Sequence, residues 1–345
     1  MQAYAILVLF GRRFAQFIAH STWTTSMRSS PQAVARPQAD LSVEGLLLDI
    51  DRFASHDGPG IRTTVFLKGC PLSCVWCHSP ESRLHAPELI YQAARCTACG
   101  LCIDECPHNA LAMGAHNGKE AAVLDRTLCD ACGLCTEVCY PGALKMAGRR
   151  VTVGDVVAQV EKDIPYFRSS GGGVTLSGGE PARQERFARH FLAACQERGI
   201  HTAMETTGYA RWETLSTLAA VTDLFLYDLK FFNDEHHRRY TGVPNRVILE
   251  NLPKLAEQGC NIHVRVPCIA GVNDSPEQIG AISRFVSGIG LSQIVLLPYN
   301  GAAGAKYEWL GRAFDLSGVE TQSDAVMNEL AAICRGHGLH VQIGG

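Results

Sequence analysis

The sequence predicts an α/β protein built on a parallel sheet or barrel, with a small inserted domain in its first half. Two observations lead to this prediction. From residue 44 onward, short apolar runs alternate with longer amphipathic ones about six times, which is typical of repeated strand–helix units. Residues 88–148 interrupt the alternation with a cysteine-rich unit starting at Cys96 that repeats 33 residues later at Cys129, which indicates an inserted domain.

Residues 1–43 precede the first expected strand and are predicted to be a flexible N-terminal extension. Residues 28–42 are rich in Ser, Pro, Gln and Ala, a composition that favours disorder. The apolar run 5–10 is far shorter than the roughly 20 residues of a membrane span, and its arginines follow it, whereas a secretory signal has them first. Met27 is an alternative start of the protein, which would make residues 1–26 an over-extended gene prediction.

The expected strands and helices alternate along the rest of the chain. Strand-like runs lie at residues 46–50, 63–67, 174–176, 202–205, 224–229, 262–266 and 294–297. Helix-like segments lie at residues 153–164, 182–198, 212–220, 246–258, 276–287 and 323–336. A barrel of such units gathers its catalytic groups at the carboxyl ends of the strands, so the segments that follow the strands are the first place to look for a site.

Charge and cysteine content narrow the class of protein. The 345 residues carry a formal net charge of −3 without a long basic block, so bulk electrostatics does not favour nucleic acid. Eleven of the 15 cysteines fall within residues 70–139, too close in sequence to pair well, and a secreted disulfide scaffold is usually shorter. Metal ligation in a reducing, oxygen-poor cytoplasm is the better interpretation. The isolated cysteines are expected to be small buried hydrophobic residues: Cys195, Cys260, Cys268 and Cys334.

Cys70, Cys74 and Cys77 follow an apolar strand with the spacing C-x3-C-x2-C. Three thiolates hold three irons of a cubane cluster and leave the fourth iron without a protein ligand, whereas most four-iron clusters have four cysteine ligands. A cluster that binds its substrate directly needs that vacancy. The alternative is a zinc site with His78 as the fourth ligand, although zinc sites use paired C-x2-C units more often.

The two units of the insert match the bacterial ferredoxin run C-x2-C-x2-C-x3-C, in which the fourth cysteine ligates the other cluster. Pro107 follows Cys106 as this pattern requires, whereas Tyr140 stands before Pro141 in the second unit. A pair of zinc sites is the alternative. The pattern predicts two [4Fe–4S] clusters, one held by Cys96, Cys99, Cys102 and Cys139, and the other by Cys106, Cys129, Cys132 and Cys135.

Together with these cysteines, an ordered set of short motifs resembles the radical S-adenosylmethionine (radical SAM) superfamily and, within it, the activating enzymes of glycyl radical enzymes. The motifs are residues 57–62 (Asp-Gly-Pro-Gly-Ile-Arg), 177–181 (Ser-Gly-Gly-Glu-Pro), 205–208 (Glu-Thr-Thr-Gly), 227–230 (Tyr-Asp-Leu-Lys), 264–267 (Val-Arg-Val-Pro) and 297–299 (Leu-Pro-Tyr). The resemblance covers roughly residues 44–345. It implies a partial (β/α)6 TIM-like radical SAM barrel, interrupted at 88–148 by a bacterial ferredoxin-like 2[4Fe–4S] domain.

The resemblance also assigns cofactor contacts. Gly178 and Gly179 have no side chains, so their backbone can come close to the methionyl part of S-adenosylmethionine, and Glu180 would be the negative partner of its ammonium group. Lys230 would meet the methionyl carboxylate. Arg265 would be a further cofactor contact.

Two assignments depend on positions where this chain departs from its relatives. Glu205 and Asp228 resemble carboxylates that hold a monovalent cation beside the cofactor, although relatives often have Asp at the first position. Asn300 stands where relatives commonly have His; it would contact the adenosyl group, and it can hydrogen-bond but carries no charge. Without the resemblance, Asp228 and Lys230 would be a neighbouring ion pair, and Arg265 part of a structural one.

The reaction follows from the resemblance. A reduced cluster passes one electron to S-adenosylmethionine, the bond to C5′ breaks, and the 5′-deoxyadenosyl radical takes a Cα hydrogen from a glycine of a partner enzyme. Pyruvate formate-lyase activating enzyme is a shorter relative without an insert, so a lyase, dehydratase or decarboxylase of the wider glycyl radical group is the expected partner. Ferredoxin or flavodoxin is the expected electron donor, and neither nucleic acid nor membrane is expected to bind.

Three questions stay open at this level. The insert can relay electrons from the donor, or it can mainly shape the surface on which the partner docks. The enzyme can be a radical SAM enzyme that acts on a small molecule instead of a protein. Finally, the chain can be a ferredoxin-like electron carrier with the barrel as scaffold, although that reading leaves the motifs at the strand ends unexplained.

Overall fold

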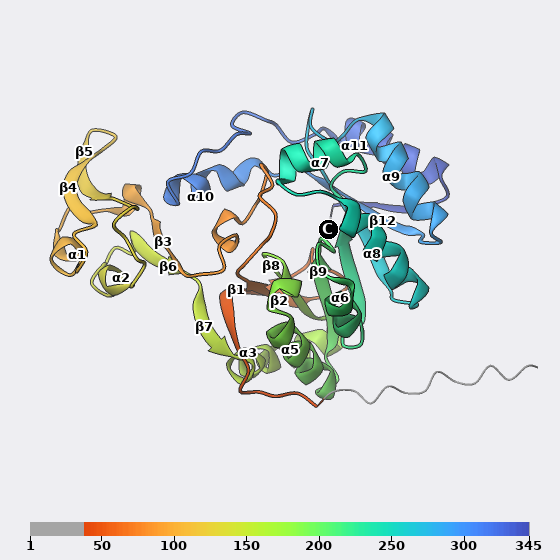
Figure 1. Cartoon of the computed structure of the whole chain (residues 1–345), viewed down its shortest axis with the longest axis horizontal. Coiled ribbons are helices and arrows are strands. Elements are labelled where there is room, and N and C mark those ends of the chain that lie inside the picture. Colours follow the sequence, from red (N-terminus) through yellow and green to blue (C-terminus); the bar gives the residue numbers. More distant parts are fainter. Residues whose placement is uncertain (1–37, 345) are drawn as a thin grey trace, which may run out of the picture. The chain divides into compact units, whose positions relative to one another are not determined.

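A nine-stranded sheet forms the centre of the computed structural model, which describes residues 38–344 (Figure 1). Seven of its strands run parallel, in the order of the sequence. They are β2 (Arg62–Leu67), β8 (Gly173–Gly178), β9 (His201–Thr206), β10 (Leu224–Asp228), β11 (Ile262–Cys268), β12 (Gln293–Pro298) and β13 (His340–Ile343). Neighbouring strands in sequence are neighbours in the sheet, as in a barrel wound in one direction. The two end strands of the described sheet do not pair with each other, so the barrel is partial, as predicted.

Two antiparallel strands extend the sheet beyond β2. They are β1 (Glu44–Ala54), which pairs with β2, and β7 (Arg149–Thr152), which pairs with β1. The sequence predicts β1 but not its direction. Only a short loop joins β1 to β2, and a short loop suits an antiparallel pair, whereas parallel strands need a longer crossover.

The six predicted helices are all present, with small shifts at their ends. They are α3 (Val153–Val160), α5 (Glu185–Glu197), α6 (Trp212–Ala219), α8 (Arg246–Glu257), α9 (Pro276–Gly288) and α11 (Asp324–Gly336). The segment predicted as one helix at 153–164 ends early, and α4 (Ile164–Ser170) begins a new one, because Pro165 lacks the N–H that an uninterrupted helix requires. The helices α7 (Asp234–Thr241) and α10 (Gly304–Trp309) lie outside the predicted segments.

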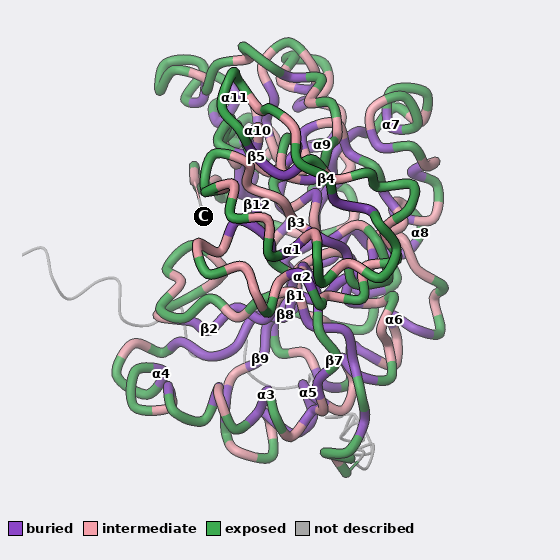
Figure 2. Tube along the Cα trace, turned by 90° about the vertical axis from the view of Figure 1, so that its left-hand side faces the viewer, coloured by how far each residue is buried: buried purple, intermediate pink, exposed green. Residues whose placement is uncertain are grey.

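The main core lies between the strands and the helices that connect them. Strands β2, β8 and β9 are almost entirely buried, and their buried stretches are purple in Figure 2. Phe187 and Phe191 of α5 stack with their rings nearly parallel in this core. Of the four isolated cysteines, Cys195, Cys268 and Cys334 are fully buried, as expected, and Cys260 is half-buried.

Residues from Glu88 to Ala147 form elements outside the nine-stranded sheet. Strands β3 (Glu88–Tyr91) and β6 (Leu144–Ala147) pair antiparallel, and β4 (Leu111–His116) and β5 (Lys119–Leu124) form a hairpin. The short helices α1 (Leu101–Asp104) and α2 (Leu134–Glu137) lie within the two cysteine runs and contain Cys102 and Cys135. Because Glu88 pairs with Ala147, the chain leaves the barrel and returns to it at one place.

Most of the predicted N-terminal extension, including Met27, lies outside the described residues. Among residues 38–344, no helix combines the length and the apolar character that crossing a membrane would require.

Candidate active site and iron–sulfur sites

A cavity of about 360 Å³ lies at the carboxyl ends of strands β2 and β8–β11. It brings together the three-cysteine loop and most of the predicted strand-end residues. The predicted residues that line it are Cys70, Cys74, Cys77, Gly178, Gly179, Glu205, Asp228, Lys230 and Arg265. Sequence positions up to about 195 residues apart therefore meet in one space, as expected for the carboxyl-terminal end of a barrel.

Backbone hydrogen bonds hold the three-cysteine loop from two sides. On one side, the N–H of Cys70 donates to the carbonyl of Arg83 (2.9 Å). On the other, the N–H groups of Ser73 and Val75 donate to the carbonyls of the last two residues of α7, Thr241 and Tyr240 (2.8 and 3.0 Å). Burial raises the pKa of the Cys70 thiol to about 12, so that thiol stays neutral at pH 7 unless a cation such as iron compensates its charge.

The donors at this loop fit an iron–sulfur cluster. Cys70 and Cys77 are half-buried and Cys74 is buried, and all three face the same cavity. Among residues 38–344, no three His, Cys, Asp or Glu side chains converge tightly enough to bind a single metal ion. A cubane does not require such convergence, because each thiolate binds a different iron.

Gly178 and Gly179 are required because the end of β8 lies against the end of β2 and the start of the three-cysteine loop. A Cβ on Gly178, whose φ is +114°, would lie 2.2 Å from the backbone nitrogen of Leu67. A Cβ on Gly179 would lie 2.4 Å from the carbonyl oxygen of Gly69, next to Cys70. Both glycines therefore let a cavity wall form where any side chain would collide with backbone.

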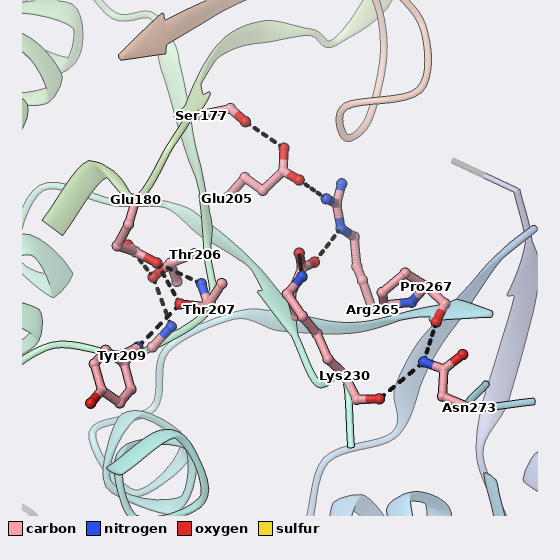
Figure 3. A network of polar contacts seen from close by, with 12 residues as sticks. Ser177, Glu180, Glu205, Thr206, Thr207, Tyr209, Lys230, Arg265, Pro267 and Asn273 are labelled. Atoms are coloured by element: carbon pink, nitrogen blue, oxygen red, sulfur yellow. Dashed lines mark hydrogen bonds and ion pairs between the residues drawn. The ribbon is translucent and has the colours of Figure 1, made fainter. Parts of the chain in front are cut away.

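Glu180 is fully buried and is not among the residues that line the cavity. Figure 3 shows its carboxylate directed at the segment after β9. It accepts hydrogen bonds from the hydroxyl of Thr206 (2.7 Å), from the N–H and hydroxyl of Thr207 (2.8 and 2.7 Å) and from the N–H of Ala182 (3.2 Å). Thr206 and Thr207 do line the cavity, so Glu180 contacts the site through them.

A chain of ion pairs crosses the cavity from β8 to β10 (Figure 3). The hydroxyl of Ser177 donates to Glu205 (2.7 Å), and Glu205 pairs with Arg265. The Nε of Arg265 also donates to Asp228 (3.1 Å), whose other oxygen accepts from Lys230 (3.0 Å). Two carboxylates and two cations thus neutralise one another, and three of these groups, Asp228, Lys230 and Arg265, are buried.

The pKa shifts follow from this pairing. Burial raises the pKa of Glu205, against the pull of Arg265. Burial acts to raise the pKa of Asp228 as well, but Lys230 and Arg265 outweigh it and the pKa is lowered. Burial acts to lower the pKa of Lys230, but the charge of Asp228 opposes it and the pKa is raised, so Lys230 stays charged.

The carboxylates predicted to hold a monovalent cation therefore already have a partner. The guanidinium of Arg265 lies between Glu205 and Asp228 and neutralises both. A cation at this position would compete with Arg265 for the two carboxylates, and the cation site stays a prediction.

Asn300 is not among the described residues that line the cavity. It is exposed, and its Oδ1 accepts from the N–H of Ala302 (3.0 Å), which caps the short turn before α10. Among the other residues that line the cavity are Asp57, Ser177, Thr206 and Thr207, to which the sequence analysis gave no role. These four belong to the motifs at residues 57–62, 177–181 and 205–208, so their place at strand ends was a signal available in the sequence.

The insert gathers its eight cysteines into two groups of four. One cavity is lined by Cys96, Cys99, Cys102 and Cys139. A second cavity is lined by Cys106, Cys129, Cys132 and Cys135. Each group combines three cysteines of one run with the fourth cysteine of the other, which is the crossed arrangement predicted from the ferredoxin pattern.

The two cysteine runs also share a backbone conformation. Ala98 and Ala131 occupy equivalent positions, and both have positive φ (57° and 60°). Backbone N–H groups point at sulfur in these loops, as those of Ala110 and Leu144 do at the Sγ atoms of Cys106 and Cys139 (3.3 Å each). Such donors stabilise charged sulfur and are one of the means by which proteins tune clusters.

Comparison with known proteins places both parts of the chain in known families. Residues 130–281 match the family model of the Radical SAM superfamily, and residues 95–143 match that of the 4Fe-4S dicluster domain. The trans-4-hydroxy-L-proline dehydratase activating enzyme of Clostridioides difficile is 39% identical over 87% of this chain and 99% of that protein. The choline trimethylamine-lyase activating enzyme of Oleidesulfovibrio alaskensis is 37% identical over 87% and 98%. The benzylsuccinate synthase activating enzyme of Thauera aromatica is 37% identical over 87% and 92%.

Proposed function

Because this chain belongs to the activating enzymes of glycyl radical enzymes, within the radical SAM superfamily, we propose that Cys70, Cys74 and Cys77 ligate the cluster at which it cleaves S-adenosylmethionine. The enzyme activates its partner by reductive cleavage of S-adenosylmethionine to methionine and a 5′-deoxyadenosyl radical, which takes a Cα hydrogen from a glycine. The observation that carries the assignment of residues is the meeting of the three cysteines with the charged strand ends in one cavity.

The cluster, when bound, supplies the electron for this cleavage. The chain's own residues bind and orient the substrate. Lys230 lines the cavity and is held 3.0 Å from Asp228, so its ammonium group is a fixed donor for the methionyl carboxylate. Arg265 is held in the same way by two carboxylates and is a further contact for S-adenosylmethionine.

Both backbone and side-chain groups contribute to binding of the methionyl ammonium group. Gly178 and Gly179 bring backbone next to the cysteine loop. Glu180 supplies the negative charge behind Thr206 and Thr207, and its hydrogen bonds orient their segment toward the cavity. Four donors on one buried carboxylate favour this indirect role over direct contact.

Residues 88–148 are proposed to be the ferredoxin-like domain within a barrel of residues 44–345. The dicluster match at residues 95–143 falls inside these limits and supports two further [4Fe–4S] clusters. Their proposed ligands are the two groups of four cysteines that line separate cavities. The partner is a glycyl radical enzyme, and the names of the relatives favour a dehydratase, lyase or decarboxylase. The cytoplasm, with ferredoxin or flavodoxin as donor, is the proposed setting.

The test is anaerobic activation of a candidate partner encoded beside this gene. We expect the glycyl radical doublet in electron paramagnetic resonance, together with 5′-deoxyadenosine, from the native chain with reductant. A variant with Cys74→Ala should give neither product. If 5′-deoxyadenosine forms while no candidate partner acquires a radical, the enzyme acts on a small molecule instead.

A further inference from the structure

Arg83 touches the backbone of the three-cysteine loop, yet it belongs to none of the strand-end motifs. It lies on the segment that runs from Cys77 back toward the insert. Its backbone carbonyl accepts from the N–H of Cys70 (2.9 Å), and its Nη2 donates to the carbonyl of Cys74. Through Tyr307 of α10 it also reaches the third cysteine, because the Tyr307 hydroxyl accepts from Nη2 (3.0 Å) and donates to the carbonyl of Cys77 (3.1 Å).

One donor of this side chain has no partner in the part of the chain that the structure describes. The Nε of Arg83 is buried and makes no hydrogen bond to any described residue. The Tyr307 ring, whose centroid lies 5.5 Å from the guanidinium carbon, covers the same group. A buried N–H donor without an acceptor is costly. We therefore expect a group bound at the cysteines to accept this hydrogen bond.

We propose that Arg83 is a positioning residue for the cluster at Cys70, Cys74 and Cys77, and that its guanidinium makes that cluster easier to reduce. The inference rests on the proposed ligation by these three cysteines. Arg83 fixes the loop at the backbone of all three ligands, at Cys77 through Tyr307. Its guanidinium also places a positive charge and one unpaired buried donor beside the loop.

The direction of the effect follows from charge. Reduction adds one electron to the cluster, and Arg83 itself neither gains nor loses an atom. A fixed positive charge stabilises the more negative, reduced form, and hydrogen bonds to cluster sulfur act in the same sense. Arg83 is half-buried and the ring of the buried Tyr307 covers its guanidinium, so water screens this charge less than it would screen an exposed one.

The experiment is an anaerobic redox titration of the holoenzyme followed by electron paramagnetic resonance. A variant with Cys70, Cys74 and Cys77 all replaced by Ala provides the signal of the insert, which is subtracted. For Arg83→Gln we expect the ratio of reduced to oxidised cluster at a fixed potential to fall about tenfold. For a one-electron couple that is a shift of about 59 mV to more negative potential.

Two further variants separate the effect of the Arg83 charge from the effect of a less tightly held loop. Arg312→Gln removes another guanidinium that holds the same segment, through the carbonyl of Pro80 (2.7 Å), and should leave the ratio unchanged. Arg83→Lys keeps the charge but cannot reach both the Cys74 carbonyl and Tyr307. In Arg83→Lys the ratio of reduced to oxidised cluster should fall about two- to fivefold, to a value between those of the native enzyme and Arg83→Gln.

The outcomes that overturn the inference are distinct. A ratio within twofold of native in Arg83→Gln, with native iron content, overturns it, and so does an equal fall in Arg312→Gln. If Arg83→Gln does not fold, an unchanged ratio in Arg83→Lys overturns it. Loss of iron from the three-cysteine site alone in Arg83→Gln supports the positioning role. If the triple Ala variant has the native spectrum, the proposed ligation fails first and the inference fails with it.

Discussion

At the scale of single residues, the active site is organised by side chains that neutralise one another before any substrate arrives. Glu205, Arg265, Asp228 and Lys230 form one chain of ion pairs. Because each charge already has a partner in a site of low dielectric, the groups need little reorganisation when S-adenosylmethionine binds. Glu180 belongs to a separate set, since its partners are hydroxyl and backbone donors.

Glu180→Gln tests whether that second set orients the site. The glutamine amide offers one oxygen and one NH2 group where the carboxylate faces four donors, so at least one buried donor loses its acceptor. An unsatisfied buried donor costs about 1–3 kcal/mol, and we expect about ten- to a hundredfold weaker binding of S-adenosylmethionine. Isothermal titration under anaerobic conditions measures this loss.

Glu185→Gln is the matched control. Glu185 also accepts from a threonine hydroxyl, that of Thr214 (3.3 Å), but it is half-buried and does not line the cavity. Native affinity in Glu180→Gln would show that the hydrogen bonds to Thr206 and Thr207 do not orient the cofactor.

At the scale of elements, the close contact between β8 and the three-cysteine loop makes one side wall of the site. The N–H of Gly179 donates to the carbonyl of Leu67 (2.8 Å), and the N–H of Glu180 donates to the carbonyl of Gly69 (2.8 Å). The strand end and the loop are therefore joined through backbone, and side chains contribute little to this contact. A change of backbone shape at β8 is transmitted directly to Cys70.

Gly179→Ala should displace the three-cysteine loop. The added Cβ would meet the carbonyl group of Gly69, which cannot move without moving Cys70. We expect the variant to lose most of the iron of the three-cysteine site and its production of 5′-deoxyadenosine, while the insert keeps its clusters. Iron analysis and electron paramagnetic resonance measure both. Gly288→Ala, at the exposed end of α9 with open space around it, should behave as native.

The crossed grouping of the insert cysteines gives a second test at this scale. If Cys139 shares a cluster with Cys96, the double variant Cys139→Ala/Cys96→Ala should lose no more iron than Cys139→Ala alone. The double variant Cys139→Ala/Cys129→Ala should lose iron from both clusters. Equal losses in the two double variants would contradict the crossed assignment.

The success of sequence-based prediction differed between elements for physical reasons. Periodicity located the parallel strands and their helices, because a buried strand needs an unbroken apolar run and a covering helix needs an apolar stripe. It missed α7, a helix whose sequence is almost entirely polar, and α10, which is only six residues long. It also could not reveal β13, a short strand that is mostly exposed.

The same limit applies to the site. Residues next to a strand end, such as Lys230 and Arg265, were found because topology places them at the cavity. Arg83 and Tyr307 were missed, because they are more than 220 residues apart and meet only when α10 folds against the segment after Cys77. The role of Glu180 depended on the direction of one side chain, which spacing does not determine.

At the scale of the whole molecule, the insert and the barrel are linked by charged contacts at the base of the three-cysteine loop. Glu88, where the insert begins, pairs with Arg312 (2.6 Å) and lies 3.6 Å from Lys68. Arg126 of the insert donates to the carbonyl of Trp309, the last residue of α10 (2.7 Å). The insert is therefore held against the segments that carry Cys70 and Tyr307.

Replacement of all eight insert cysteines by Ser tests what the insert contributes. If its clusters relay electrons, activation of the partner should fall at least a hundredfold with ferredoxin or flavodoxin, yet survive largely with an artificial reductant. Radical yield with each reductant measures this. Equal activity with both would mean that the insert acts as a docking surface, and equal loss with both would mean that the barrel site depends on it structurally.

The pairing of Glu88 with Ala147 has a consequence for how such enzymes diversify. Because the two ends of the insert are direct neighbours across β3 and β6, deleting it leaves a gap that a tight turn can close, and the strand order of the barrel is unaffected. An ancestor could thus acquire, exchange or discard the cluster-bearing segment in a single genetic event. By the same geometry, an engineered chain could receive a different redox module at this junction without redesign of its catalytic half.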